Sequence, residues 1–143
     1  MQISFTVPGE PRGKGRPRFS TANGRVTTRT PHETAMYENL IRLEYQRQCA
    51  GMRFADDAEL AMTLFAYYAI PKSASKKKKL AMLKSEMRPI KTPDLDNVIK
   101  AVGDSLNQIA YRDDAQIVEV HACKHYSTEP RLEIVINLQG GET

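Results

Sequence analysis

The feature that most constrains the fold is an apolar stripe that begins just after Asp94 and continues to residue 109. Its members recur at spacings of three and four, the period of one helix face: Leu95, Val98, Ile99, Val102, Leu106 and Ile109. Such a stripe predicts a helix that packs against a sheet. Asp96, Lys100 and Asp104 follow at intervals of four and form a polar row beside it. Gly103 interrupts the helix former pattern and is expected to allow close packing there.

Acidic residues gather at both ends of this predicted helix. Asp94 and Asp96 lie at its start, where free backbone N–H groups and the helix dipole favour negative charge, and Asp113 and Asp114 follow its end. Two interpretations stay open. Converging carboxylates repel one another, and a hard divalent cation bound between them would relieve the repulsion. Alternatively, they are a helix cap, a surface ion pair of Asp96 with Lys100, and turn residues.

The remaining patterns predict four strands and two further helices. In chain order these are a strand over 2–7, a helix from about 31 to Cys49, a strand over 59–70, a short helix over 75–87, and strands over about 116–126 and 131–138. Ala, Leu and Met within 59–70 leave helix as a competing interpretation. The order β-α-β-α-α-β-β predicts one α/β domain, 1–143, with a mixed β-sheet of about four strands and helices packed mainly on one face.

The two other helices have expected starts and contact faces. The first should begin at Thr30 and Pro31, with Glu33 completing a capping box. Residues 8–19, rich in Gly, Pro and Arg, are expected to form the loop before it. The side chains expected to pack are Met36, Tyr37, Leu40 and Ile41 in the first helix, and Leu80, Leu83 and Met87 in the short one.

Basic residues concentrate in two segments of a chain whose net charge is +4. Residues 10–30 hold six Lys and Arg against one acid, and residues 72–91 hold eight against one acid. This distribution is typical of a protein that binds a polyanion, although two solvated loops are the simpler alternative. The candidate DNA-binding residues are Arg12, Lys14, Arg16, Arg18, Lys76, Lys77, Lys78, Lys79, Arg88 and Lys91.

Other function classes find little support in the sequence. No apolar run approaches the roughly 20 residues of a membrane-spanning helix, and no signal peptide is visible, so a cytoplasmic protein without a membrane partner is expected. Cys49 and Cys123 are expected to be free thiols, and the three histidines lack a zinc-binding spacing. No small-molecule cofactor is expected.

The acidic group suits phosphodiester hydrolysis. Magnesium held by carboxylates activates a water molecule and stabilises both the transition state and the leaving oxygen. Asp94, Asp96 and Asp114 would be its ligands, with Asp113 as the alternative to Asp114. Lys100 would contact a phosphate oxygen or position the water. These residue types alone leave nuclease, polymerase and phosphatase open.

A longer motif resembles one family. The segment Asp94-Leu95-Asp96-Asn97-Val98-Ile99-Lys100-Ala101, then Asp104-Ser105-Leu106-Asn107, then Tyr111-Arg112-Asp113-Asp114-Ala115-Gln116-Ile117-Val118 resembles the signature of the RusA family of Holliday junction resolvases. Before the motif, the arginine cluster of that family is reduced here to Arg88 and Lys91, with a lysine-rich segment upstream. The N-terminal half is similar in plan only.

The resemblance implies a small homodimeric endonuclease of phage or prophage type that depends on Mg²⁺, with Mn²⁺ as a substitute. It would act in DNA recombination and repair by nicking two symmetry-related strands of a four-way junction, which requires two symmetry-related active sites. It assigns metal binding and catalysis to Asp94, Asp96 and Asp114, and names Lys100 as the catalytic lysine. Asp104 also matches a family position and is expected to support the site.

Two other functions compete with this one. A nonenzymatic nucleic-acid-binding protein would have the basic segments and a merely structural acidic cluster. A metal-dependent phosphohydrolase of small nucleotides would need a closed pocket, and the two basic segments favour a longer anion.

Overall fold

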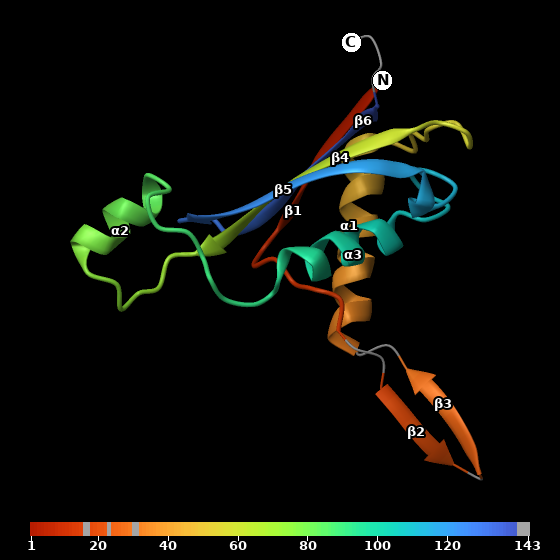
Figure 1. Cartoon of the computed structure of the whole chain (residues 1–143), viewed down its shortest axis with the longest axis horizontal. Helices are drawn as coiled ribbons and strands as arrows, with labels where there is room; N and C mark the ends of the chain where they lie inside the picture. Colours follow the sequence, from red (N-terminus) through yellow and green to blue (C-terminus); the bar gives the residue numbers. More distant parts are fainter. Residues whose placement is uncertain (16–17, 23, 30–31, 140–143) are drawn as a thin grey trace.

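The computed structural model describes residues 1–15, 18–22, 24–29 and 32–139, and its centre is a mixed sheet of four strands in the order β1-β6-β4-β5 (Figure 1). Strand β1 (Gln2–Pro8) pairs antiparallel with β6 (Arg131–Leu138), and β6 pairs antiparallel with β4 (Leu60–Ala69). Strand β4 in turn pairs parallel with β5 (Ile117–Ser127). The predicted α/β class, strand number and element order are confirmed.

Strand β4 settles the competition between strand and helix in its segment. Its residues alternate between buried and half-buried along the whole strand, from Leu60 to Ala69. Alternate positions reach opposite faces only in a strand, so a helix would have distributed these apolar side chains around its axis. The buried set, Leu60, Met62, Leu64, Ala66 and Tyr68, forms the middle of the core.

Two helices lie on the same side of the sheet and complete the core (Figure 1). Helix α1 (His32–Cys49) buries Tyr37, Ile41 and Tyr45, and α3 (Leu95–Ser105) buries Val98 and Val102 of the predicted stripe. The expectation for Met36 is wrong, because its side chain is 58 % exposed. Helix α1 packs through side chains spaced four apart from Tyr37 to Cys49, and this row leaves Met36 at its margin.

Helix α2 (Lys76–Leu83) lies away from this core, beside one end of the sheet, where it contacts β5 (Figure 1). Its N-cap is Ser75, whose hydroxyl accepts a hydrogen bond from the backbone N–H of Lys78 at 3.2 Å. The expected contact face is wrong: Leu80, Leu83 and Met87 are exposed, and Met82 is buried instead. A helix of eight residues presents only one short face to the sheet, and here that face carries Met82.

A hairpin of β2 (Arg18–Ala22) and β3 (Arg25–Arg29) follows the N-terminal loop. The hairpin projects from the rest of the molecule near the start of α1 (Figure 1). The sequence analysis missed it, although Asn23-Gly24 is a typical hairpin turn. The predicted helix start at Thr30 and Pro31 and the position of Arg16 lie outside the described residues, as does the tail from 140 to 143.

The helices of the structure can be compared with the length and apolarity of a membrane-spanning segment. Within the described ranges, none is both long enough and apolar enough to cross a bilayer.

Candidate active site on helix α3

Asp94 occupies the N-cap position of α3 without acting as its cap. Its backbone is extended, as an N-cap requires, but its side chain makes no capping hydrogen bond. Ser75 at the start of α2 does make such a bond, to the N–H of Lys78. The interpretation of Asp94 as only a helix cap therefore fails, and its carboxylate is available for another role at the positive end of the helix.

Asp96 and Lys100 do not form the surface ion pair that the simpler interpretation assumed. Nζ of Lys100 lies instead 3.8 Å from Oδ2 of Asp104, one turn further along α3. In the part of the chain that the structure describes, no ion pair involves the carboxylate of Asp96. The first turn of α3 thus presents two carboxylates, from Asp94 and Asp96, with the Lys100 ammonium on the following turn.

Asp114 returns to the same helix, as the spacing of the motif allowed. A Cβ atom added at Gly103 would lie 3.3 Å from Oδ2 of Asp114, so the carboxylate rests against the backbone of α3. The backbone N–H of Asp114 donates to Oδ1 of Asn107 at 2.7 Å. The expected close packing at Gly103 is confirmed. Gly103 is seven residues beyond Asp96, which corresponds to about 10 Å along the helix axis.

Asp113 has a different role from Asp114. It is the N-cap of the 3₁₀ turn η1 (Asp114–Gln116), and its carboxylate accepts from the N–H of Ala115 at 2.9 Å. Gln116 completes a capping box by accepting from the N–H of Asp113 at 3.2 Å. The turn interpretation is therefore correct for Asp113, and this separates it from Asp114 as a candidate ligand.

The candidate ligands do not form a closed cluster in this structure. Within residues 1–15, 18–22, 24–29 and 32–139, no three Asp, Glu, His or Cys side chains lie close enough together to hold one ion. The candidate ligands nevertheless all lie along α3: Asp94 and Asp96 are at its start, and Asp114, from η1, packs on its third turn.

Lys14 forms ion pairs with two carboxylates beside this site. Its Nζ lies 2.7 Å from Oε2 of Glu38 on α1 and 3.1 Å from Oδ2 of Asp104 on α3. Burial lowers the pKa of Lys14, but the hydrogen bonds to these two carboxylates outweigh burial, so the pKa lies above its ordinary value. Lys14 is one of the predicted DNA-binding residues. In the structure its contacts join the N-terminal loop to both helices and balance the charge of the buried Glu38, a role that sequence reasoning missed.

Tyr111 contacts the third turn of α3 through its hydroxyl. This hydroxyl is buried and donates to the carbonyl of Gly103 at 2.8 Å, and Gly103 is the residue on which Asp114 packs. Burial, followed by the negative charges of Asp114 and Asp104, raises the pKa of this phenol far above its ordinary value. The neutral phenol is therefore a permanent donor that fixes the third turn of α3 where Asp114 packs.

Two hydrogen bonds from side chains of the sheet fix the segment that precedes Asp94. The hydroxyl of Tyr68 on β4 donates to the carbonyl of Pro93 at 2.7 Å, and Nζ of Lys124 on β5 donates to the carbonyl of Lys91 at 2.6 Å. Burial, Glu10 and Asp94 raise the pKa of Tyr68 to about 12. Tyr68 reads as an ordinary core residue in the sequence, so no local signal reveals this role.

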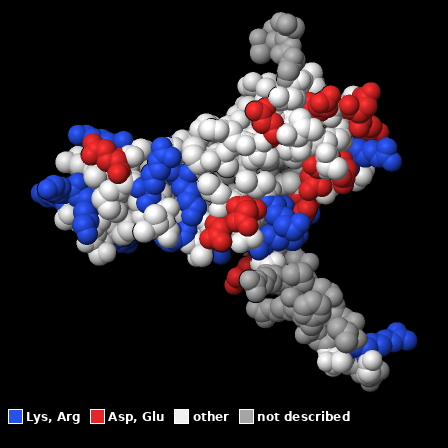
Figure 2. Space-filling view, viewed as in Figure 1, with Lys and Arg blue, Asp and Glu red and all other residues white. Residues whose placement is uncertain are grey.

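The other basic candidates lie on the surface. Arg12, Arg88 and Lys91 are exposed, and so are most of the lysines of α2. Figure 2 shows basic side chains gathered at the end of the molecule that α2 forms, and acidic side chains along α3 and beyond it. Arg18 lies in β2, with its side chain outside the described set, and Arg16 lies outside it altogether.

A comparison with known families places the chain in one class of protein, the DNA-cutting nucleases. A family model described as "Endodeoxyribonuclease RusA" matches residues 8–137, nearly the whole chain. The chain therefore belongs to the RusA endodeoxyribonuclease family, which implies an endonuclease that resolves Holliday junctions. It is also 39 % identical over 136 residues to "Uncharacterized protein YqaN" of Bacillus subtilis (strain 168), an alignment that covers 94 % of each chain.

Proposed function

We propose that this protein is a magnesium-dependent, structure-selective endodeoxyribonuclease that resolves four-way DNA junctions by paired symmetric nicks in DNA recombination and repair. One observation carries the proposal. Asp94 begins α3 with a carboxylate that caps nothing, while a separate turn brings Asp114 back onto the same helix at Gly103. The carboxylate of Asp94 is not used to cap the helix, and the packing of Asp114 on Gly103 is not needed to form a turn.

The donor type suits a hard divalent cation, although the three carboxylates would have to come closer together than they lie in this structure to share one ion. Magnesium prefers carboxylate oxygens and water, and Asp94, Asp96 and Asp114 would supply the carboxylates, with manganese as a substitute. Asp94 and Asp96 are adjacent on one turn, and Asp113 is excluded from the set because its carboxylate caps η1. Bound there, the ion would lower the pKa of a water molecule and stabilise the charge that develops on the phosphate.

The side chains of the chain itself would orient the phosphate. Lys100 projects from the turn after Asp96, and the carboxylate of Asp104 at 3.8 Å restrains its ammonium. In this position the ammonium would contact a phosphate oxygen and oppose its negative charge as the transition state forms. Asp104 would act only through Lys100 and Lys14, which makes it a positioning residue.

Basic residues of the two segments rich in Lys and Arg would hold the DNA backbone. We assign this role to Arg12, Arg16, Arg18, Arg88, Lys91 and the lysines of α2 from Lys76 to Lys79. Lys14 is omitted because Glu38 and Asp104 already occupy its ammonium. A homodimer would place two such sites on a two-fold axis, which matches the symmetry of a four-way junction.

Cleavage of a labelled synthetic four-way junction tests this proposal. We expect the wild type to cut with Mg²⁺ and not with a chelator, and Asp96→Asn to lose cleavage while its junction affinity stays equal or rises. Asp57→Asn, an exposed carboxylate distant in sequence from α3, serves as the control and should cut normally. Tight junction binding without cleavage in all three proteins would favour a nonenzymatic binding protein.

A further inference from the structure

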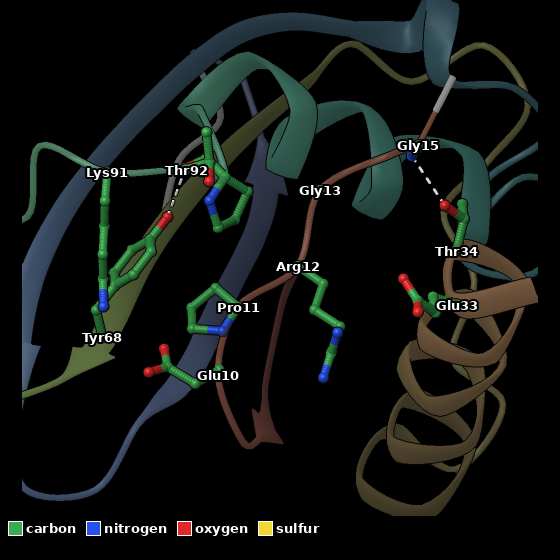
Figure 3. Close-up of a pocket in the computed structure, with 11 residues that line it drawn as sticks. Glu10, Pro11, Arg12, Gly13, Gly15, Glu33, Thr34, Tyr68, Lys91 and Thr92 are labelled. Atoms are coloured by element: carbon green, nitrogen blue, oxygen red, sulfur yellow. Dashed lines mark hydrogen bonds between the residues drawn. The ribbon is translucent and has the colours of Figure 1, made fainter. Parts of the chain in front are cut away.

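A pocket of about 570 Å³ opens beside the start of α3, and its described lining does not include Asp94, Asp96 or Asp114 (Figure 3). Its walls come from the N-terminal loop, the first turn of α1, the end of β4 and the segment before Asp94. We propose that this pocket binds one nucleotide of the strand that is cut, next to the scissile phosphate. The inference rests on the proposed function and adds a specificity site to it.

The loop that forms one wall is fixed against two helices. The backbone N–H of Gly15 donates to Oγ1 of Thr34 at 2.8 Å, and that of Lys14 donates to the carbonyl of Asn97 at 3.0 Å (Figure 3 shows the first of these). A Cβ atom added at Gly13 would lie only 2.7 Å from Cβ of Asn97, so a glycine is required for this approach. The pocket is therefore formed before any ligand binds.

The pocket reaches to within one residue of the candidate active site. Pro93 lines it, and Asp94 follows directly. Tyr68 lines it too, and its hydroxyl holds the carbonyl of Pro93. The hydroxyl of Tyr68 thus joins the lining of the pocket to the residue that directly precedes Asp94. A ligand in the pocket would thus adjoin the phosphate held at Asp94.

The lining has the mixed character that a nucleotide needs. Arg12 and Lys91 enter from different walls, and among the described residues neither is joined to an acid by an ion pair (Figure 3). These two cations can bind a phosphate group. The rings of Pro11, Pro93 and Tyr68 offer flat apolar surface for a base or sugar.

The two acids of the pocket argue against a simple anion site. Oε1 of Glu10 accepts from the backbone N–H of Ala69 at 3.1 Å, which fixes its carboxylate, and Glu33 lies on the first turn of α1. Both carboxylates would repel free phosphate. A nucleotide within a DNA strand, in contrast, presents the N–H donors of its base to the carboxylates while its phosphate faces the cations. We therefore assign the pocket to a nucleotide and not to phosphate alone.

The first test compares cleavage positions on four-way junctions whose bases around the crossover are randomised. We expect the wild type to favour some sequences. In the double variant Arg12→Gln/Lys91→Gln that distribution should flatten, and kcat/KM on the favoured sequence should fall about tenfold or more. Arg47→Gln, at the opposite end of α1, is the matched control and should keep both. An unchanged distribution in the double variant would overturn the assignment.

The second test does not depend on cleavage. The ¹⁵N-labelled protein is titrated with a 5′-phosphorylated dinucleotide, and separately with inorganic phosphate, without metal. Amide signals of Gly13, Gly15 and Lys91 should shift with the dinucleotide in the wild type and in Asp96→Asn, but not in the double variant. Equal shifts with inorganic phosphate, or none with the dinucleotide, would overturn the nucleotide assignment. Dinucleotide shifts in a protein that cuts no junction would instead refute the proposed function and leave the pocket standing.

Discussion

The carboxylate of Asp114 rests on the backbone of Gly103, in the third turn of α3, where any side chain larger than hydrogen would meet it. Two hydrogen bonds hold this contact from either side. Asn107 accepts from the N–H of Asp114, and Tyr111 donates to the carbonyl of Gly103. The relationship joins residues 11 apart in the sequence and makes α3 the common support of every candidate ligand.

Gly103→Ala should separate catalysis from stability. An added Cβ at 3.3 Å from Oδ2 of Asp114 displaces that carboxylate, so we expect the cleavage rate to fall about tenfold or more. Alanine favours helix over glycine by up to about 1 kcal/mol, so the free energy of unfolding should not fall in proportion. Single-turnover cleavage and urea unfolding measure the two quantities. A variant that cuts at the wild-type rate would show that the position of Asp114 does not matter.

Magnesium should stabilise the folded protein through the same carboxylates. An ion that binds only the native state at 100 times its Kd adds about 2.7 kcal/mol to the free energy of unfolding. We expect a rise in melting temperature with Mg²⁺ in the wild type and in Asp57→Asn, and a much smaller rise in Asp94→Asn, Asp96→Asn and Asp114→Asn. Without metal, these three variants should be about as stable as the wild type, because none of the three carboxylates takes part in an ion pair among the described residues.

If Mg²⁺ shifts the melting temperature equally in all five proteins, the ion binds elsewhere. Thermal unfolding followed by circular dichroism is sufficient for this comparison, since it needs no DNA and no catalytic turnover. The result therefore tests the ligand assignment separately from the nuclease activity.

Lys14→Met should destabilise the protein by leaving Glu38 buried without its nearest cation. The expected loss is about 1–3 kcal/mol at neutral pH, since Lys14 is itself only 22 % exposed. In a Glu38→Gln background the same substitution should cost clearly less, and this double-mutant cycle isolates the pair. Equal costs in both backgrounds would mean that the ion pair contributes nothing.

The stability that Lys14 adds should also depend on pH in a defined direction. Its pKa is raised in the folded state above the ordinary value of 10.5. The stabilisation is therefore fully present below that value and is lost as the pH rises through the raised pKa. The difference in free energy of unfolding between the wild type and Lys14→Met should shrink above about pH 10.5. Urea unfolding from pH 8 to pH 11.5 measures it, and a difference that grows with pH would contradict the pairing.

Helix α2 should govern how junction affinity depends on salt. If its lysines contact phosphates, Lys77→Gln and Lys78→Gln together should reduce the slope of log K against log salt by about 2. Arg47→Gln should leave the slope unchanged, because Arg47 pairs with Glu44 on its own helix. Fluorescence anisotropy with a labelled junction, in Ca²⁺ in place of Mg²⁺ to prevent cleavage, gives the slopes. Identical slopes in all variants would remove α2 from the DNA-binding surface.

Much of this architecture could be predicted because apolar residues recur with the period of a strand or of a helix. The alternation in Leu60 to Tyr68 and the stripe from Val98 to Leu106 both place apolar side chains on one face, and the structure buries them there. The contact face of α2 could not be predicted, because eight residues give too few periods to distinguish Met82 from Leu80 and Leu83.

The sequence names the residues of the candidate site but not their contacts. The motif singled out Asp94, Asp96, Lys100 and Asp114, yet it gave no means to tell a carboxylate that caps from one that does not. That difference depends on side-chain geometry at Asp94 and Asp113. The partners of Lys14 and Tyr68 lie 24 and 25 residues away in the chain, and only the packing of loop, sheet and helix brings them together.

The most direct test of the central claim uses a supercoiled plasmid with an extruded cruciform, which is a four-way junction. One nick releases the supercoiling and the cruciform is reabsorbed, so only two nearly simultaneous nicks yield linear DNA. We predict linear plasmid as the main product for the wild type with Mg²⁺, with ligatable nicks at symmetric positions, and no product for Asp96→Asn or Asp114→Asn. Nicked circles alone from the wild type, or linear product from either variant, would contradict the account.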